Sequence, residues 1–313
     1  MNEKEALAIV VAIHGNYVFV ESDCILEKNS PESTLLEDSN INTRILCTCR
    51  NKISYKGEIP KVGDSVVIES IDWANRTAVI TEIKPRINFL TRPSLANVQC
   101  VFVVLSYIMP SIDIDQATRF LIAAEEPNVE VVIVLSKIDL ISSEEVDIQL
   151  TQFRSWGYKS IAISVNTGEG FSALKEIIAS SSISVFCGPS GVGKTSLINK
   201  LLPYSSLKEG ALTKRLSRGR HTTRHVELYS FSNRIRIADS PGFNRPEFNI
   251  KLIDLQWYFP EIRNQLEIKR CKFRNCLHQE ELGCAIDKNW ERYLIYRRCL
   301  QDLINSPRPF QGV

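Results

Sequence analysis

Hydrophobic and polar positions follow one pattern up to residue 84 and a different one beyond it. In the first part, short apolar runs alternate with turn residues such as His14-Gly15-Asn16 and Val62-Gly63-Asp64. The runs lie at residues 8–13, 17–21, 41–50, 65–68 and 77–83. Roughly five short strands with little helix in about 80 residues suit a small closed barrel, and the oligonucleotide-binding (OB) barrel is the obvious candidate. We therefore predict an all-β OB barrel at residues 1–84, with a polar loop at residues 27–40.

Beyond residue 98 the apolar runs are of the buried type and alternate with segments of helical periodicity. The expected strands and helices lie at residues 100–105, 114–126, 129–135, 160–164 and 171–179. Such alternation predicts a doubly wound α/β domain with a parallel sheet. We assign this domain to residues 85–250 and a small, mostly helical domain to residues 251–313.

A glycine-rich turn after another apolar run carries the strongest chemical motif. Gly188 and the triplet Gly193-Lys194-Thr195 match G-x-x-x-x-G-K-S/T, the phosphate-binding loop. Glycines allow backbone N–H groups to converge on an anion, and the positive end of the following helix adds to the attraction. Lys194 would reach the β- and γ-phosphates, and the Thr195 hydroxyl would complete the Mg²⁺ shell. The expected loop residues are Gly188, Pro189, Ser190, Gly191, Val192, Gly193, Lys194, Thr195 and Ser196.

Two further motifs indicate that the bound base is guanine. Ser136-Lys137-Ile138-Asp139 follows a strand and resembles N/T-K-x-D, in which the aspartate accepts hydrogen bonds from guanine N1 and the 2-amino group. Ser164-Val165-Asn166-Thr167-Gly168 matches S-x-x-x-G, in which backbone N–H groups contact guanine O6. Both segments follow expected strands, and α/β sheets bind their ligands at the carboxyl ends of strands.

The order of the motifs indicates a circular permutation. Asp239-Ser240-Pro241-Gly242 follows the apolar run 235–238 and fits DxxG, the sensor of the Mg²⁺-bound water and the γ-phosphate. Ordinary GTPases begin with the phosphate loop, whereas here both guanine motifs precede it. The site is built from loops at one sheet edge, so cutting the chain elsewhere preserves it. Motion near Asp239 and Gly242 would then pass directly into the C-terminal domain.

The C-terminal domain contains a cluster of metal-binding residue types, namely Cys271, Cys276, His278 and Cys284. Three thiolates and one imidazole suit tetrahedral Zn²⁺ in a closed, structural site, with buried thiols as the alternative. Because few apolar residues are available for burial, we expect residues 251–313 to need the metal to fold. Of the nine cysteines, Cys299 is expected to pack on a helix. The same packing role is expected for five other cysteines, because their spacing gives no four-ligand set: Cys24, Cys47, Cys49, Cys100 and Cys187.

Charge and composition add the expected partners and location. The net charge is only +2, but basic residues crowd one segment, namely Lys208, Lys214, Arg215, Arg218, Arg220 and Arg224. The barrel could have a nucleic-acid-binding face, and the alternative is a solvated surface. The face would consist of Tyr55 and five cations: Arg44, Arg50, Lys52, Lys56 and Lys61. No apolar run reaches the roughly 18 residues that span a bilayer, and the first residues do not form a signal peptide. We therefore expect a cytoplasmic protein with no membrane partner.

Together these motifs resemble the RsgA (YjeQ/YloQ) family of circularly permuted GTPases that depend on the small ribosomal subunit. The resemblance covers nearly the whole chain and rests on residues 62–64, 85–93, 136–140, 188–196, 219–223 and 239–242 and the four metal ligands. It implies an OB barrel, a permuted GTPase and a C-terminal zinc domain. It also implies binding to the small subunit late in maturation, with ribosome contact stimulating GTP hydrolysis and release.

The same resemblance implies the partners. They would be ribosomal RNA and ribosomal proteins, contacted mainly by the barrel face and the zinc domain. The arginines of residues 215–224 would contact RNA phosphates. We expect the chain to act as a monomer that binds GTP and GDP.

The expected mechanism assigns roles to residues of the switch segments. Thr223, or Thr222 instead, would close over Mg²⁺ and the γ-phosphate. Asp239 would orient a Mg²⁺-bound water, and Gly242 would donate its N–H. Many GTPases orient the attacking water with a glutamine after DxxG, but Phe243 occupies that position here. The resemblance therefore points to His221 as the residue that orients the attacking water. His225, in the same segment, is the second candidate.

Two other functions remain open at this stage. Ser136 stands where the family usually has asparagine, so guanine affinity could fall although Asp139 preserves the choice of base. Ser136 and Phe243 would also suit a nucleotide-independent RNA-binding module with a degenerate GTPase core. Intact Lys194, Thr195 and Asp239 oppose that reading. An ATPase is disfavoured by Asp139 and by the loop that starts at Ser164.

Overall fold

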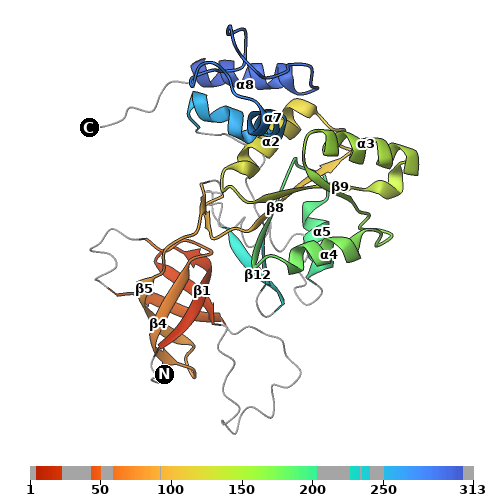
Figure 1. Cartoon of the computed structure of the whole chain (residues 1–313). Helices are drawn as coiled ribbons and strands as arrows, with labels where there is room; N and C mark the ends of the chain where they lie inside the picture. Colours follow the sequence, from red (N-terminus) through yellow and green to blue (C-terminus); the bar gives the residue numbers. More distant parts are fainter. Residues whose placement is uncertain are drawn as a thin grey trace.

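The chain consists of a barrel, an α/β domain and a helical unit that follow one another along the molecule (Figure 1). The structure is a computed structural model that describes residues 5–22, 44–50, 59–91, 93–202, 226–232, 235–239 and 250–305. Within these ranges, no helix has the length and apolar character needed to cross a membrane.

Five strands close into the N-terminal barrel: β1 (Glu5–His14), β2 (Tyr17–Ser22), β3 (Arg44–Cys49), β4 (Ser65–Asp72) and β5 (Thr77–Ile83). Strand β1 pairs with both β2 and β4, and β5 lies between β3 and β4, so the ring is complete. Alternate side chains point inward and form a core of small and branched residues, among them Val10, Val20, Ile45, Val66, Ile68 and Ile80. The predicted OB-type barrel is confirmed, and β5 has the predicted bounds.

The α/β domain is built on six strands, with order β10-β9-β8-β11-β13-β12. They are β8 (Cys100–Ser106), β9 (Glu130–Ser136), β10 (Lys159–Ala162), β11 (Ile183–Cys187), β12 (Glu227–Ser232) and β13 (Ile235–Asp239). The first five in the order are parallel neighbours, and β12 is antiparallel to β13. Because both faces of these strands are covered, nearly every residue of β8, β9 and β11 is buried.

Helices cover both faces of this sheet, as the doubly wound prediction requires. They are α2 (Ile114–Glu125), α3 (Ser143–Ser155), α4 (Phe171–Ala179) and α5 (Lys194–Leu201). Phe120 of α2 and Phe153 of α3 pack with Val101 and Val103 on one face of β8. Helices α4 and α5 pack with Phe102 and the other face. Short elements complete the domain: β6 (Phe89–Leu90), β7 (Leu95–Ala96) and the 3₁₀ helix η2 (Ile138–Leu140).

The hydrophobic pattern did not predict α3 or β12. Helix α3 buries only Phe153, so its sequence lacks the apolar stripe on which such predictions depend. It begins instead with a capping box, in which the Ser142 side chain accepts from the Glu145 N–H and Glu145 accepts from the Ser142 N–H. Local capping therefore defines a helix that periodicity misses.

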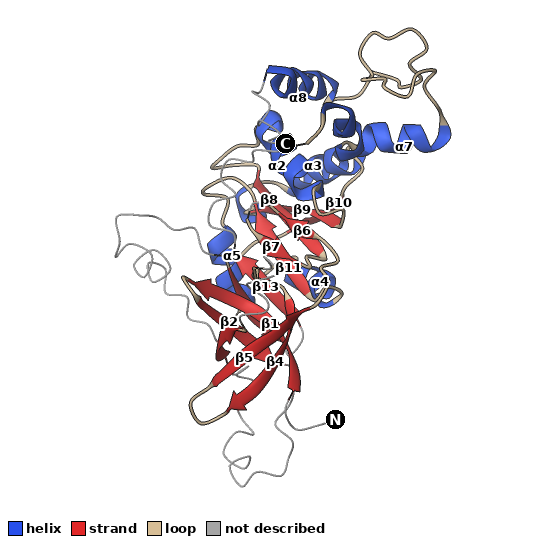
Figure 2. Ribbon diagram, turned by 90° about the vertical axis from the view of Figure 1, so that its left-hand side faces the viewer, coloured by secondary structure: helices blue, strands red, loops and turns tan. Residues whose placement is uncertain are grey.

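The C-terminal unit comprises η3 (Leu252–Tyr258), α7 (Pro260–Ile268) and α8 (Tyr293–Asn305), which lie at the far end of the molecule from the barrel (Figure 2). The expectation that it has few apolar residues to bury is wrong. A cluster of buried residues joins it to Ile122 of α2: Leu255, Phe259, Ile262, Ile286, Ile295, Tyr296, Cys299 and Leu300. Cys299 is fully buried there, as its predicted packing role requires.

A buried ion pair fixes the chain where it leaves the barrel. Asp64 is 0 % exposed, and its carboxylate accepts from Arg86 Nε at 2.7 Å and Arg86 Nη2 at 2.9 Å. The Lys61 backbone N–H donates to the same carboxylate at 2.7 Å. The turn before β4 and the segment after β5 are thereby held together.

Replacing Asp64 with alanine should reduce the free energy of unfolding by about 3 kcal/mol, because the half-buried Arg86 guanidinium loses its partner. Glu82→Ala is the matched control: it removes an exposed ion pair with Lys84, and its effect should stay below about 1 kcal/mol. Urea unfolding measures the free energy of unfolding of both variants. If both variants lose the same small amount of this free energy, the Asp64–Arg86 pair does not stabilise the fold.

Candidate functional site

Four predicted motifs converge on one edge of the sheet. Strands β10, β9, β11 and β13 are all parallel within the order given above, so their carboxyl ends point the same way. The two guanine motifs follow β9 and β10, the phosphate loop follows β11, and Asp239 ends β13. The separate sequence motifs therefore belong to one site, at the edge where doubly wound sheets bind ligands.

The phosphate loop has the backbone that its glycines predict. Gly188, Gly191 and Gly193 have φ angles of 137°, 83° and 96°, in the region that residues with a Cβ rarely adopt. A Cβ on Gly188 would lie 2.1 Å from the Val104 carbonyl oxygen of β8. Val192 is 1 % exposed and anchors the loop in the core. Helix α5 begins directly after the loop, so its positive end faces the loop's interior.

The Lys194 ammonium already lies within this loop. Its Nζ donates to the carbonyl oxygens of Gly188 at 2.8 Å and Pro189 at 2.7 Å. Thr195, the predicted Mg²⁺ ligand, is exposed at the first turn of α5. Ser190 is exposed at the tip of the loop, and Ser196 is half-buried. The loop and the first turn of α5 therefore bring a cation and an exposed hydroxyl close together in the chain.

The first guanine motif is tied to the phosphate loop by two side chains. Ser136 is 3 % exposed, and its hydroxyl lies 2.7 Å from the Val192 carbonyl oxygen, to which it donates. The Leu105 carbonyl oxygen is also within 3.0 Å. Lys137 has a left-handed backbone, with φ 61°, and its Nζ donates to the Gly191 carbonyl oxygen at 2.7 Å. The serine in place of asparagine thus joins the base-binding and phosphate-binding segments.

The Asp139 carboxylate is held by the second guanine loop. Its Oδ1 accepts from Ser164 Oγ at 2.6 Å, and its Oδ2 accepts from Asn166 Nδ2 at 2.8 Å. Donation by Ser164, and then by Asn166, holds the pKa of the Asp139 carboxyl below its usual value. The group is therefore ionised at neutral pH, the form that accepts hydrogen bonds from a guanine base. The buried Ile138 anchors the motif, and its N–H donates to the Ile163 carbonyl oxygen.

The second guanine loop has its own supports. A Cβ on Gly170 would lie 2.0 Å from the Ala162 carbonyl oxygen, so only glycine fits at the start of α4. Lys200 of α5 donates from Nζ to the Val165 carbonyl oxygen. Sequence analysis did not identify Lys200, because its contact crosses between elements that no motif links.

Most residues that were predicted to act in hydrolysis lie outside the described ranges. The backbone of Asp239 pairs with Phe186 of β11, next to the start of the phosphate loop. Other predicted residues lie outside the described ranges: His221, Thr222, Thr223, His225, Gly242 and the basic residues 208–224. Tyr55, Lys52, Lys56, Cys24 and the loop at residues 27–40 lie outside them as well.

The four predicted metal ligands come together in the C-terminal unit. The ligand atoms of Cys271, Cys276, His278 and Cys284 all lie within 4.8 Å of one another. His278 Nδ1 is 3.6 Å from both the Cys271 and the Cys284 Sγ atoms. Cys276 and His278 are 4 % and 1 % exposed. The donor set and its burial fit a closed four-ligand metal site.

Gln256 completes this site, and sequence analysis missed it. Its Oε1 lies 2.7 Å from His278 Nε2, so the ring donates there and leaves Nδ1 to face the cysteines. Burial lowers the pKa of the His278 imidazole, so the ring is neutral at pH 7, the form that binds metals. Gln256 precedes the cysteine cluster in η3, where no ligand-spacing rule would find it.

Charged residues join the barrel to the strand pair that the switch segments flank. Glu21 of β2 is 3 % exposed and Arg236 of β13 is 0 % exposed. Glu21 Oε2 accepts from Ser230 Oγ at 2.7 Å and lies 3.3 Å from Arg236 Nε. Arg44 of β3 pairs with Glu227 of β12 and lies 3.5 Å from Glu21. We call these five residues the barrel–sheet junction.

The junction also changes the predicted role of one residue. Arg44 is one of the cations that could form a nucleic-acid-binding face or a solvated surface, and its guanidinium is engaged by Glu227, Glu21 and the Leu228 carbonyl oxygen. Strand β1 pairs with β12 at Ala12 and Glu227, so the barrel and the α/β sheet form one continuous sheet of 11 strands.

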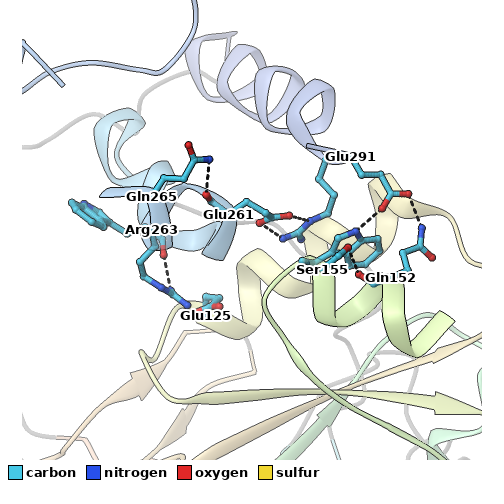
Figure 3. Close-up of polar contacts among 10 residues, drawn as sticks. Glu125, Gln152, Ser155, Glu261, Arg263, Gln265 and Glu291 are labelled. Atoms are coloured by element: carbon cyan, nitrogen blue, oxygen red, sulfur yellow. Dashed lines mark hydrogen bonds and ion pairs between the residues drawn. The ribbon is translucent and has the colours of Figure 1, made fainter. Parts of the chain in front are cut away.

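A different interface fixes the C-terminal unit to α2 and α3 (Figure 3). Arg292 is 0 % exposed, and its Nε and Nη2 donate to the Glu261 carboxylate at 2.7 and 2.6 Å. The guanidinium also lies over the rings of Trp156, Tyr158 and Phe259, at 4.9 to 5.4 Å from their centroids.

Further polar contacts surround this cation. Glu291 accepts from Trp156 Nε1 at 2.7 Å and from Gln152 Nε2 at 2.6 Å. Arg263 pairs with Glu125 at 3.2 Å (Figure 3). The C-terminal unit is thus attached to the ends of two helices of the α/β domain.

Comparisons with known proteins agree with this architecture. A model of the RsgA GTPase family matches residues 83–249. Small ribosomal subunit biogenesis GTPase RsgA of Prochlorococcus marinus (strain MIT 9313) is 47% identical over 307 residues, covering 97% of this chain and 94% of that protein. The protein of the same name from Synechococcus sp. (strain CC9311) is 45% identical, covering 97% and 96%.

Solved structures extend the similarity to the whole fold. The crystal structure of YjeQ from Thermotoga maritima has a TM-score of 0.75 at 28% identity, covering 97% of this chain and all of that chain. That of YloQ, described as a circularly permuted GTPase, has a TM-score of 0.71 at 27% identity and covers 98% of both chains. The chain belongs to the RsgA GTPase family.

Proposed function

We propose that the chain is a ribosome-stimulated GTPase that binds the small ribosomal subunit, assists its late maturation and is released after GTP hydrolysis. The observation that best supports GTPase activity is the position of the Asp139 carboxylate, which Ser164 holds at the same sheet edge as the phosphate loop. Relatives that share the full length of the chain are named as small ribosomal subunit biogenesis GTPases. A nucleotide-independent RNA-binding module would not require a carboxylate held at the same sheet edge as a phosphate loop.

The proposed chemistry relies on positioning and charge. Lys194 Nζ would leave its carbonyl partners on Gly188 and Pro189, and together with backbone N–H groups of the loop it would stabilise negative charge on the phosphates. Mg²⁺, when bound with GTP, supplies further neutralisation of phosphate charge. Thr195, Thr223 and, through water, Asp239 would hold it. His221 would orient the attacking water, and Gly242 would donate its N–H to the γ-phosphate.

The base would be read by three elements. Asp139 would accept from guanine N1 and the 2-amino group, the backbone of Val165 and Asn166 would face O6, and Lys137 would lie along the ring. An adenine base offers no N1–H donor, so Asp139 disfavours ATP.

We further propose that Cys271, Cys276, His278 and Cys284 hold one structural Zn²⁺. The imidazole orientation set by Gln256 and the burial of the cluster support this choice. The chain would act in the cytoplasm as a monomer, with ribosomal RNA and ribosomal proteins as its partners.

The barrel–sheet junction offers a route by which ribosome contact reaches the switch segments. Strand β12 begins two residues after His225, and β13 ends at Asp239 of the DxxG motif. Separating the buried Glu21 and Arg236 charges would be costly, so the barrel and the β12–β13 pair should move together. A force on the barrel would then act on the residues that surround the γ-phosphate.

GTP turnover, measured with and without small ribosomal subunits, tests the proposed function. The chain alone should hydrolyse GTP slowly, and subunits should accelerate it strongly. Lys194→Ala should reduce the stimulated kcat by at least about 100-fold, because the phosphate charge loses a main partner.

The same assay separates the rival functions. Turnover of ATP at a rate equal to that of GTP would overturn the choice of base. Tight subunit binding without any turnover would leave an RNA-binding protein with an inactive nucleotide fold.

Loss of the metal should destabilise the C-terminal unit selectively, although its apolar cluster remains. Cys276→Ser should abolish the one equivalent of zinc measured by metal analysis, and hydrogen exchange of residues 260–268 should increase at least about tenfold. Cys299→Ser is the matched control, because that thiol is also buried but does not belong to the set of four candidate metal ligands. Zinc retained by Cys276→Ser, or lost equally from both variants, would contradict the ligand assignment.

The junction is tested by removing either member of one pair. Arg44→Ala and Glu227→Ala should each reduce stimulation by the subunit about tenfold, and the double variant should be no worse than Arg44→Ala, because that variant already removes the Arg44–Glu227 contact. Affinity for the subunit, measured by sedimentation, should not change. If Arg44→Ala weakens subunit binding while Glu227→Ala does not, Arg44 contacts RNA directly and the proposed coupling is wrong.

A further inference from the structure

Both oxygens of the Asp139 carboxylate are engaged by side chains of one neighbouring loop. Ser164 Oγ donates to Oδ1 at 2.6 Å, and Asn166 Nδ2 donates to Oδ2 at 2.8 Å. Sequence analysis assigned Asn166 only a backbone contact with the base. The contact of its side chain therefore needs a separate explanation.

The two donors differ in their surroundings. Ser164 is fully buried, and its Oγ also accepts from the Thr167 N–H at 3.1 Å. Asn166 is exposed, so no packing requires its amide to point at Asp139. Its loop is nevertheless well supported, because the Gly168 N–H donates to the Ser164 carbonyl oxygen and Lys200 Nζ donates to that of Val165.

The number of hydrogen bonds matches the needs of guanine. Each carboxylate oxygen has two acceptor positions, and the Ser164 and Asn166 side chains donate to different oxygens. This arrangement places the two oxygens side by side, which suits a base that presents two parallel donors, N1–H and the 2-amino group. If Ser164 were the one side-chain donor, the exposed Asp139 carboxylate could rotate about its Cβ–Cγ bond, and the position of Oδ2 would no longer be fixed.

We propose that the Asn166 side chain is a specificity-determining positioning residue, which holds Oδ2 of Asp139 so that both oxygens face a two-donor base. The inference rests on the proposed guanine-nucleotide site and adds to it a residue that favours guanine over hypoxanthine. Hypoxanthine has N1–H but no 2-amino group, so it needs only one oxygen of the carboxylate.

Binding of GDP and IDP to the full chain tests the proposal. Asn166→Ala should weaken GDP binding about five- to tenfold and IDP binding less than about twofold, so the preference for GDP should fall. Thr167→Ala is the matched control: its side chain accepts from the Glu169 N–H in the same loop and does not contact Asp139. This control should leave the ratio of the two dissociation constants unchanged.

A second variant tests the donor itself. Asn166→Asp keeps the shape of the side chain but replaces the donating amide with a negative carboxylate, which repels Asp139. It should weaken GDP binding at least as much as Asn166→Ala does.

Three outcomes would overturn the inference. Equal losses for GDP and IDP in Asn166→Ala would indicate a general role in loop structure. Tighter GDP binding would mean that the amide occupies a position the base needs. Unchanged GDP binding by Asn166→Asp would show that no donor is required.

Failure of the proposed function gives a different result. If the unaltered chain binds GDP no more tightly than ADP, the guanine-nucleotide site itself is wrong. If the unaltered chain prefers GDP but Asn166→Ala keeps the GDP-to-IDP ratio, only the role of Asn166 fails.

Discussion

The parallel pairing of β11 with β8 on one side and β13 on the other is the constraint on which the rest of the structure depends. It places the phosphate loop between the DxxG strand and the first strand of the α/β domain. Gly188 approaches the Val104 carbonyl oxygen so closely that no side chain fits. With β11 in this position, the loops after β9 and β10 necessarily open at the same edge.

Contacts across this edge hold the segments of the site together as one unit. Ser136 and Lys137 reach carbonyl oxygens of the phosphate loop, and Lys200 of α5 reaches the second guanine loop. Base recognition and phosphate binding therefore share a common support. Circular permutation leaves this support intact, because it depends on which strands are neighbours and not on their order in the chain.

The permutation also decides what lies on either side of the site. The barrel is attached to the β12–β13 pair through the barrel–sheet junction, in which Glu21 and Arg44 contact Glu227 and Arg236, whereas the C-terminal unit is attached through Arg292 and its aromatic neighbours. The first interface involves strands β12 and β13, which begin at Glu227 and end at Asp239, and the second involves α2 and α3. Signals from the barrel and from the C-terminal unit would thus enter the GTPase at different places.

The sequence by itself determined the features that depend on local chemistry. Alternating apolar residues specify the barrel strands, glycines at positive φ specify the phosphate loop, and Cys271 to Cys284 carry their ligands close together in the chain. Only the tertiary structure decided which distant groups meet: Ser136 with Val192, Asn166 with Asp139, Gln256 with His278, and Arg44 with Glu227. Such partners are chosen when strands and loops pack, because a side chain's hydrogen-bonding capacity does not specify which distant group will satisfy it.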